Sequence, residues 1–207
     1  MALPNQLTNK SYLWLSIFFG FLLWSGIEPK DRLTWVLEAG PAMIGLLVIA
    51  QSRKSFPLTP LLYFWILVHC ILLMVGAKYT YAEVPLFDSI SEALGWERNN
   101  YDKVGHFMQG FVPALLAREI LIRKQIVDFA GWRNFIILSI CLAFSAFYEL
   151  IEWWAAEIIG EDAEAFLGTQ GYVWDTQSDM ALALLGAIAC LLTLAKIHDR
   201  QLSGLND

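Results

Sequence analysis

The sequence has few charged residues and few cysteines. Only 16% of its 207 residues are Asp, Glu, Lys or Arg, whereas 57% are apolar. A typical soluble domain carries about 25% charged residues, and a mean hydropathy of +0.50 points the same way. The three cysteines, Cys70, Cys141 and Cys190, lie inside apolar stretches, which argues against a disulfide framework. The composition therefore excludes an ordinary soluble domain and predicts an integral membrane protein.

Other familiar features are missing as well. We expect no removable signal peptide, because the first apolar run is long for one and no small-residue cleavage site follows it before Glu28. The connections at 78–100 and 157–174 are too short for a soluble domain with its own core. No phosphate loop, dinucleotide fingerprint or evident nucleophile motif is present. The net charge of −6 argues against a nucleic-acid partner.

Long uncharged apolar runs are abundant instead. A bilayer core about 30 Å thick needs roughly 20 helical residues to cross it. The runs and their flanks predict an all-α helix bundle, a single membrane domain over 1–207 with six transmembrane helices at 11–27, 33–49, 60–77, 102–122, 133–155 and 175–195. Segment 78–100 is expected to lie at the membrane interface, with a short helix near 89–94.

The distribution of Lys and Arg predicts the orientation. With six spans, one side of the membrane holds nine of these residues: Lys10, Arg53, Lys54, Arg118, Arg123, Lys124, Arg133, Lys196 and Arg200. The other side holds five: Lys30, Arg32, Lys78, Arg98 and Lys103. Both termini are therefore expected in the cytoplasm, and the loop before the last span, which has no Lys or Arg, is expected outside.

In this topology three sets of ionisable residues start from the outer face. Asp102 and His106 are four residues apart, and so are Asp175 and Asp179, while a Glu pair at 149 and 152 is three apart. Each spacing places both side chains on one side of a helix. At a rise of 1.5 Å per residue, His106 and Asp179 lie roughly 6 Å below their helix starts. The three sets are therefore predicted to share one pocket.

Electrostatic cost supports a shared pocket. A charge near the bilayer midplane costs about 3 kcal/mol, so intramembrane carboxylates should face protein or a water-filled cavity. Several carboxylates together cannot all stay ionised without a cation between them, which could be Lys103 with protonated His106, a bound metal, or protons. Glu38, near the outer start of the second span, is expected as a supporting group.

The predicted site can be written out in full. The predicted ligand-binding residues are Asp102, Lys103, His106, Gln109, Glu149, Glu152, Asp175 and Asp179. The candidate metal ligands among them are His106, Glu149, Glu152, Asp175 and Asp179. If the site is catalytic, His106 and Asp102 are the candidates for acid–base roles.

Helix capping is an alternative for two of these residues. Asp102 and Asp175 stand at helix starts, where a carboxylate caps free N–H groups. Glu149 and Glu152 fit no capping role, because they lie late in their helix, where the helix dipole disfavours anions. Function is therefore the better interpretation for the Glu pair.

Other polar and aromatic residues are expected to be structural. His69, in the middle of the third span, is expected to be a neutral hydrogen-bonding residue between helices. Arg118 and Glu119 are interpreted as a pair at the inner interface. Trp153 and Trp154 are typical of an interfacial aromatic belt, although their rings could also floor a ligand site.

Four long motifs lie between Tyr79 and Gly186. They read YTYAEVPLF at 79–87, RNNYDKVGHFMQGF at 98–111, FYELIEWW at 147–154 and LGTQGYVWDTQSDM at 167–180. These motifs resemble the bacterial inner-membrane family typified by YjdF, which implies a multi-pass protein of the bacterial inner (plasma) membrane.

A shorter pattern resembles VanZ-like membrane proteins, some of which are associated with glycopeptide-antibiotic resistance. The pattern is Asp-Lys-x-x-His-Phe opening a span, a Glu pair late in the next span and an Asp at the start of the following one. Carried over to this sequence, the resemblance points to Asp102, Lys103, His106, Glu149, Glu152, Asp175 and Asp179. Neither resemblance implies an established activity.

Three functions are compatible with such a pocket. The first is binding of a divalent cation or a polar head group at the outer leaflet, and Mn²⁺, Mg²⁺, Ca²⁺ or Zn²⁺ suits mostly oxygen ligands with one imidazole. Hydrolysis or group transfer on a lipid-linked substrate is then conceivable. The second is a structural or partner-binding role, in which the buried polar network fixes helix register. The third is proton- or cation-coupled transport. The expected partners are the lipid bilayer and a head group or cation.

Overall fold

The computed structural model describes residues 8–160 and 169–205. These residues form helices and no strand, so the all-α prediction is confirmed for the described part of the chain. The element order is α1 (Asn9–Gly26), α2 (Arg32–Ser52), α3 (Pro60–Tyr79), the 3-10 turn η1 (Tyr81–Glu83), α4 (Pro85–Leu94), α5 (Tyr101–Arg123), α6 (Ala130–Ile159) and α8 (Asp175–Ser203). The middle of the predicted outer loop, 161–168, lies outside the described residues.

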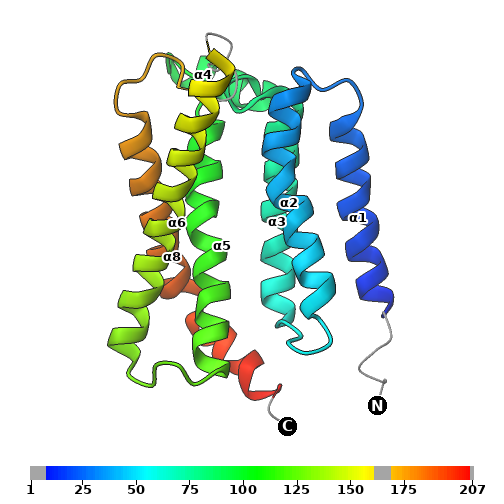
Figure 1. Cartoon of the computed structure of the whole chain (residues 1–207), viewed down its shortest axis with the longest axis vertical. Helices are drawn as coiled ribbons and strands as arrows, with labels where there is room; N and C mark the ends of the chain where they lie inside the picture. The colour runs from blue at the N-terminus through cyan, green and yellow to red at the C-terminus, as the bar shows by residue number, and fades with distance from the viewer. Residues whose placement is uncertain (1–7, 161–168, 206–207) are drawn as a thin grey trace.

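The long helices run side by side in two groups. Figure 1 shows α1, α2 and α3 on one side and α5, α6 and α8 on the other, with α4 lying across one end. Both termini lie at the opposite end. Helix α3 packs against α5 and joins the groups. We call the two ends of the bundle the α4 end and the terminal end.

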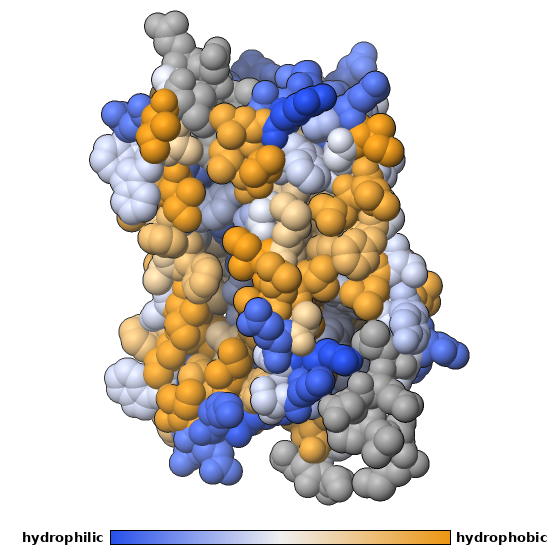
Figure 2. Space-filling model, turned by 45° about the vertical axis from the view of Figure 1, so that its right-hand side comes forward, coloured by the Kyte–Doolittle hydropathy of each residue, from blue (hydrophilic) through white to orange (hydrophobic). Residues whose placement is uncertain are grey.

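The surface of the bundle suits a membrane. Apolar side chains cover most of the middle of the face in Figure 2, and hydrophilic residues gather towards its two ends. In the described residues, four helices (α2, α3, α6 and α8) are long and apolar enough to cross a bilayer. Helix α5 falls short because it carries ionisable residues near both ends, including Asp102, Lys103, Arg118 and Glu119.

Several boundaries differ from those predicted. Helix α8 continues to Ser203 and α6 starts at Ala130, both beyond the apolar runs, because a helix does not have to stop where the bilayer does. The short interfacial helix starts earlier than expected. Pro85 occupies its first turn, where a missing N–H costs nothing, and Gly95 ends it in a left-handed conformation with φ of 67°.

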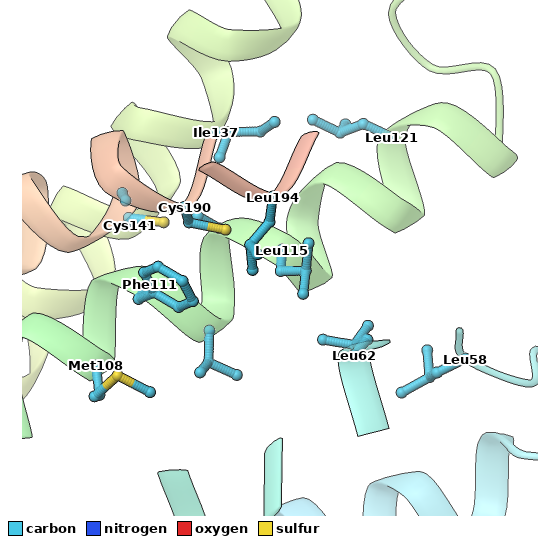
Figure 3. Close-up of a cluster of buried hydrophobic side chains, with 13 residues drawn as sticks. Leu58, Leu62, Met108, Phe111, Leu115, Leu121, Ile137, Cys141, Cys190 and Leu194 are labelled. Atoms are coloured by element: carbon cyan, nitrogen blue, oxygen red, sulfur yellow. The ribbon is translucent and has the colours of Figure 1, made fainter. Parts of the chain in front are cut away.

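The main apolar core lies towards the terminal half of the bundle. Figure 3 shows it as buried side chains from α3, α5, α6 and α8, among them Leu62, Phe111, Leu115, Ile137 and Leu194. Cys141 and Cys190 belong to the same core. All three cysteines are buried and free, in agreement with the expectation of no disulfide framework.

Helices α5 and α8 cross at a very close approach. A Cβ on Gly110 would overlap the backbone of Ala183, and a Cβ on Gly186 would overlap the backbone of Phe107. Small residues allow helix backbones to approach in this way, and packing replaces the hydrophobic driving force that lipid does not supply. This crossing fixes the depth and rotation of α8 relative to α5.

The crossing generates a stability prediction. Gly186→Ala should lower the free energy of unfolding by about 1–3 kcal/mol, because the backbones must separate to admit the methyl group. Thermal unfolding of the purified protein in detergent measures the loss. Gly20→Ala is the matched control in α1: no atom lies within 4 Å of the place that its Cβ would occupy, so it should not lower stability. Equal unfolding temperatures for both variants would contradict the proposed close crossing.

Candidate functional site

A buried cluster centred on His106 lies at the α4 end. Its Nε2 atom is 3.2 Å from Oδ1 of Asp102 and 3.9 Å from Oδ2 of Asp179, and its Nδ1 is 3.9 Å from Oε1 of Glu149. All four side chains are buried. We call these residues the His106 cluster. Three helices, α5, α6 and α8, therefore bring together an imidazole and three of the carboxylates that the sequence predicts to meet.

Both ring nitrogens of His106 face oxygen atoms. Besides Glu149, Nδ1 lies 3.2 Å from Oε1 of Gln109, one turn further along α5. An imidazolium would donate from both nitrogens to these acceptors, whereas a neutral imidazole leaves one nitrogen free to bind a cation. The oxygen atoms around His106 therefore favour a positive charge, either on the protonated ring or on a cation bound to one ring nitrogen.

Two carboxylate oxygens of the cluster have no hydrogen-bond partner. They are Oδ2 of Asp102 and Oε1 of Glu149, both buried, on side chains of residues that are 6% and 9% exposed. Buried polar atoms in folded proteins nearly always have partners, and an unpaired charged atom is especially costly. Ligand atoms of Asp102, His106 and Asp179 also lie within 4.8 Å of one another. The cluster thus combines unpaired carboxylate oxygens with a spacing of ligand atoms that could hold a metal ion.

Asp175 and Lys103 lie towards the rim. Oδ1 of Asp175 accepts a hydrogen bond of 2.8 Å from Nη1 of Arg98, which makes this carboxylate part of an ion pair. The ammonium of Lys103 lies 5.6 Å from the ring centre of Tyr172. Arg98 and Lys103 also line a shallow surface cavity of about 690 Å³ beside Trp96. Asp175 and Lys103 thus have partners other than His106.

Capping is the wrong interpretation for Asp102 and Asp175. The residues at the N-cap positions of α5 and α8 are Asn100 and Trp174, and neither helix has a side-chain cap hydrogen bond. Both aspartates lie inside the first turn instead. Their carboxylates contact other side chains instead: Arg98, between α4 and α5, pairs with Asp175, and His106, one turn further along α5, contacts Asp102.

A second cavity adjoins the cluster between α2, α3, α5 and α6. Its volume is about 410 Å³, and its walls include Glu38, His69, Asp102, His106 and Glu152. We call it the Glu38 cavity. Glu38 is buried and lines this cavity together with Asp102 and His106, as expected of a supporting group from α2. His69, which was expected only to bridge helices, faces this cavity.

Two tyrosines of the Glu38 cavity were missed by sequence reasoning. The hydroxyl of Tyr148 donates to Oε2 of Glu38 over 3.4 Å. Tyr81 comes from η1, and its ring fills space that Gly76 and Gly105 leave, since a Cβ on either would overlap it. Burial raises the pKa of Tyr81 and keeps it a neutral phenol. The sequence signal for Tyr81 is the pair Gly76 and Gly105. These glycines point to a buried ring only once the structure shows that both lie against Tyr81.

A second polar cluster lies at the terminal end. Glu119 is fully buried and accepts hydrogen bonds from the backbone N–H and hydroxyl of Thr59, from Nε2 of His198 and from Nη1 of Arg123, at 2.7 to 3.0 Å. Nδ1 of His198 in turn accepts from Arg118. This set of five residues is the Glu119 cluster.

The interpretation of Arg118 and Glu119 as a pair with each other is wrong. Arg118 donates instead to His198 over 3.0 Å and to Asp199 over 2.7 Å. Adjacent residues of an α-helix point about 100° apart, so each side chain meets different partners. His198 lies beyond the predicted end of the last span and was missed for that reason. Trp153 and Trp154 are exposed, as expected for an aromatic belt.

Apolar residues of α5 separate the two clusters. Met108, Phe111, Val112 and Leu115 are buried between His106 and Glu119 along this helix. The two polar clusters therefore have separate environments, one with orphaned carboxylate oxygens and one with a carboxylate whose partners all come from the protein.

Comparison with known proteins identifies relatives of the whole chain. A family model described as "Predicted membrane protein (DUF2238)" matches residues 10–200. The inner membrane protein YjdF of Escherichia coli (strain K12) is 50% identical over 201 residues, which cover 97% of this chain and 95% of that protein. No solved structure matches the chain. The resemblance to the YjdF family is confirmed, and the one to VanZ-like proteins stays a prediction.

The Glu119 cluster generates the second prediction. Glu119→Ala should lower the free energy of unfolding by about 3–5 kcal/mol, because it leaves several buried donors without an acceptor. Glu119→Gln keeps an oxygen acceptor and should lose less. Thermal unfolding in detergent measures both, with Glu92→Gln on the exposed face of α4 as the control. An alanine variant as stable as the control would show that the cluster does not hold α3, α5 and α8 together.

Proposed function

This chain belongs to the DUF2238 family of predicted membrane proteins, and we propose that it is a multi-pass protein that holds a divalent cation in the His106 cluster. The predicted localisation in the inner membrane is confirmed, since the relative is an inner membrane protein and four helices are long and apolar enough to span a bilayer. The proposed cation ligands are Asp102, His106 and Asp179, with Glu149 beside them.

The proposed topology has six spans, formed by α1, α2, α3, α5, α6 and α8. Nine of the 14 Lys and Arg residues belong to the side predicted to be cytoplasmic, and both termini lie at one end of the bundle. The terminal end is then cytoplasmic and the α4 end is external. The His106 cluster accordingly lies just below the outer surface, within reach of ions from outside.

The observation that carries the proposal is the buried Oδ2 of Asp102 without a partner. Three carboxylates surround one imidazole here, and even a protonated His106 balances only one of them. Arg98, at the same end of the bundle, is paired with Asp175. A divalent cation would supply the missing positive charge and a bond to the orphaned oxygen.

The donor set favours a transition metal over Mg²⁺ or Ca²⁺. One imidazole with two carboxylates is a combination that Zn²⁺ and Mn²⁺ accept, whereas Mg²⁺ and Ca²⁺ prefer oxygen alone. Around an ion with bonds of about 2.1 Å, adjacent ligand atoms lie about 3 to 3.4 Å apart. Nε2 of His106 lies 3.2 Å from Oδ1 of Asp102, which fits this range for a carboxylate that binds the ion through both oxygens. Oδ2 of Asp179, at 3.9 Å from Nε2, needs only a small approach.

An ion held by three side chains keeps coordination positions for water or for an oxygen of a substrate. Such an ion polarises that oxygen and lowers the pKa of bound water. The site could therefore catalyse hydrolysis or group transfer on a lipid-linked substrate. The residues of this chain would position the ion, and Gln109 would fix the orientation of the His106 ring.

A structural role is the second candidate. It is favoured by the position of His106 within 4 Å of carboxylates from three helices, which is how a protonated imidazole would fix helix register. This role needs no ion. The two candidates therefore differ in their response to chelation.

Metal loading tests the proposal. Protein treated with a chelator and then given Mn²⁺ or Zn²⁺ should bind about one equivalent by elemental analysis and calorimetry. At a free ion concentration of 100 times Kd, its stability should rise by about 2.7 kcal/mol. Asp179→Asn should weaken binding by at least about tenfold, since the loss of a supporting residue alone has that effect. Glu92→Gln should bind as the wild type does.

Two results would contradict the cation site. One is wild-type protein that holds no metal and whose unfolding temperature does not respond to added divalent ions. The other is Asp179→Asn protein that binds the ion as tightly as the wild type. A variant that is less stable both with and without ions, and shows no metal dependence, would support the structural role.

A further inference from the structure

The Glu38 cavity has a polar end and an apolar end. Glu38, Asp102 and Glu152 form its acidic wall, and the hydroxyl of Tyr148 points to Glu38. Apolar residues from α2, α3 and α6 form the remaining wall, including Leu73 and Ile151. A volume of about 410 Å³ is within the range of small-molecule pockets. The cavity is therefore amphipathic and large enough for a head group with the first part of an alkyl chain.

The rim of the cavity is apolar and exposed. Ile44 of α2 and Phe144 and Phe147 of α6 line it, and they are 62%, 62% and 53% exposed. Figure 1 places α2 and α6 in different helix groups, and each packs mainly on members of its own group. In a bilayer these exposed side chains face lipid. An apolar chain could thus extend from the cavity into the membrane between α2 and α6.

The acidic wall selects the charge of the occupant. No Lys or Arg is among the described residues that line the cavity. The proposed cation at Asp102, His106 and Asp179 would leave the carboxylates of Glu38 and Glu152 without a positive partner. An anionic head group would be repelled here, whereas an ammonium group would be attracted.

We infer that the Glu38 cavity binds a single-chain amphiphile with an ammonium head group, which enters from the bilayer between α2 and α6. The head lies between Glu38 and Glu152, and the chain runs along the apolar wall past Gly45 to the rim. A phospholipid fits less well, because its phosphate has no basic partner among the described residues that line the cavity. This site goes beyond the proposed cation site, since it depends on two carboxylates that the cation does not use.

Binding of dodecylamine to the protein in phosphatidylcholine nanodiscs tests the inference. Wild type should bind about one dodecylamine per chain saturably, above the background of empty nanodiscs, and dodecanol should bind at least about tenfold more weakly because it lacks the charge. The double variant Glu38→Gln/Glu152→Gln should lose at least about tenfold in affinity for the amine. Glu92→Gln, at the exposed surface of the same end, should behave as the wild type does.

A second variant blocks the cavity without changing its charge. No atom lies within 4 Å of a Cβ placed on Gly45, so Gly45→Leu puts a side chain into open space and should preserve folding. It should reduce binding of dodecylamine by at least about tenfold, while binding of Mn²⁺ to the His106 cluster stays unchanged. This variant keeps the inference testable if the double variant fails to fold.

The results separate this site from the cation site. Asp179→Asn should weaken binding of Mn²⁺ and leave binding of dodecylamine intact, and Gly45→Leu should do the reverse. Three results would each overturn the inference. The wild type could bind dodecylamine and dodecanol equally, or bind no more dodecylamine than empty nanodiscs do. The third result is a Gly45→Leu variant that binds dodecylamine with full affinity. Competition of dodecylamine by phosphatidylethanolamine at equal concentration would overturn the choice of a single-chain ligand.

Discussion

The cost of ionised groups in an apolar bundle is the constraint on which this structure depends. Each buried carboxylate needs a positive or hydrogen-bonding partner. At the terminal end, Glu119 obtains its partners from Thr59, Arg123 and His198. At the α4 end, Asp102 keeps a buried oxygen without one. The same molecule thus shows one polar cluster whose central carboxylate has partners from the protein and one that keeps an unpaired carboxylate oxygen.

Helix α5 links the two clusters to the rest of the fold. It carries Asp102 and His106 near one end and Glu119 near the other, with an apolar core between them. Its close crossing with α8 at Gly110 and Gly186 determines where Asp179 and His198 reach it. Tight packing at the middle of the bundle therefore positions polar groups at both ends, which a loosely packed pair of helices would not do.

The cation site and the amphiphile site would divide the acidic residues between them. Asp102, His106 and Asp179 would hold the ion, while Glu38 and Glu152 would face the head group in the adjoining cavity. An ion with open coordination positions could bind and activate a water molecule. That water would lie beside the amphiphile bound in the adjoining cavity. The proposed metal would then lie next to a candidate substrate from the membrane.

The sequence by itself determined the helices and the pairs within each helix, because apolar runs and spacings of three or four residues depend only on local geometry. It therefore predicted that Asp102 with His106, and Asp175 with Asp179, share a helix side. The tertiary structure alone decided that Arg98 pairs with Asp175, that Tyr81 fills the space beside Gly76 and Gly105, and that His198 joins Glu119 to Arg118. Those contacts depend on the rotation and depth of one helix against another, which packing sets and which spacing along one chain segment does not encode.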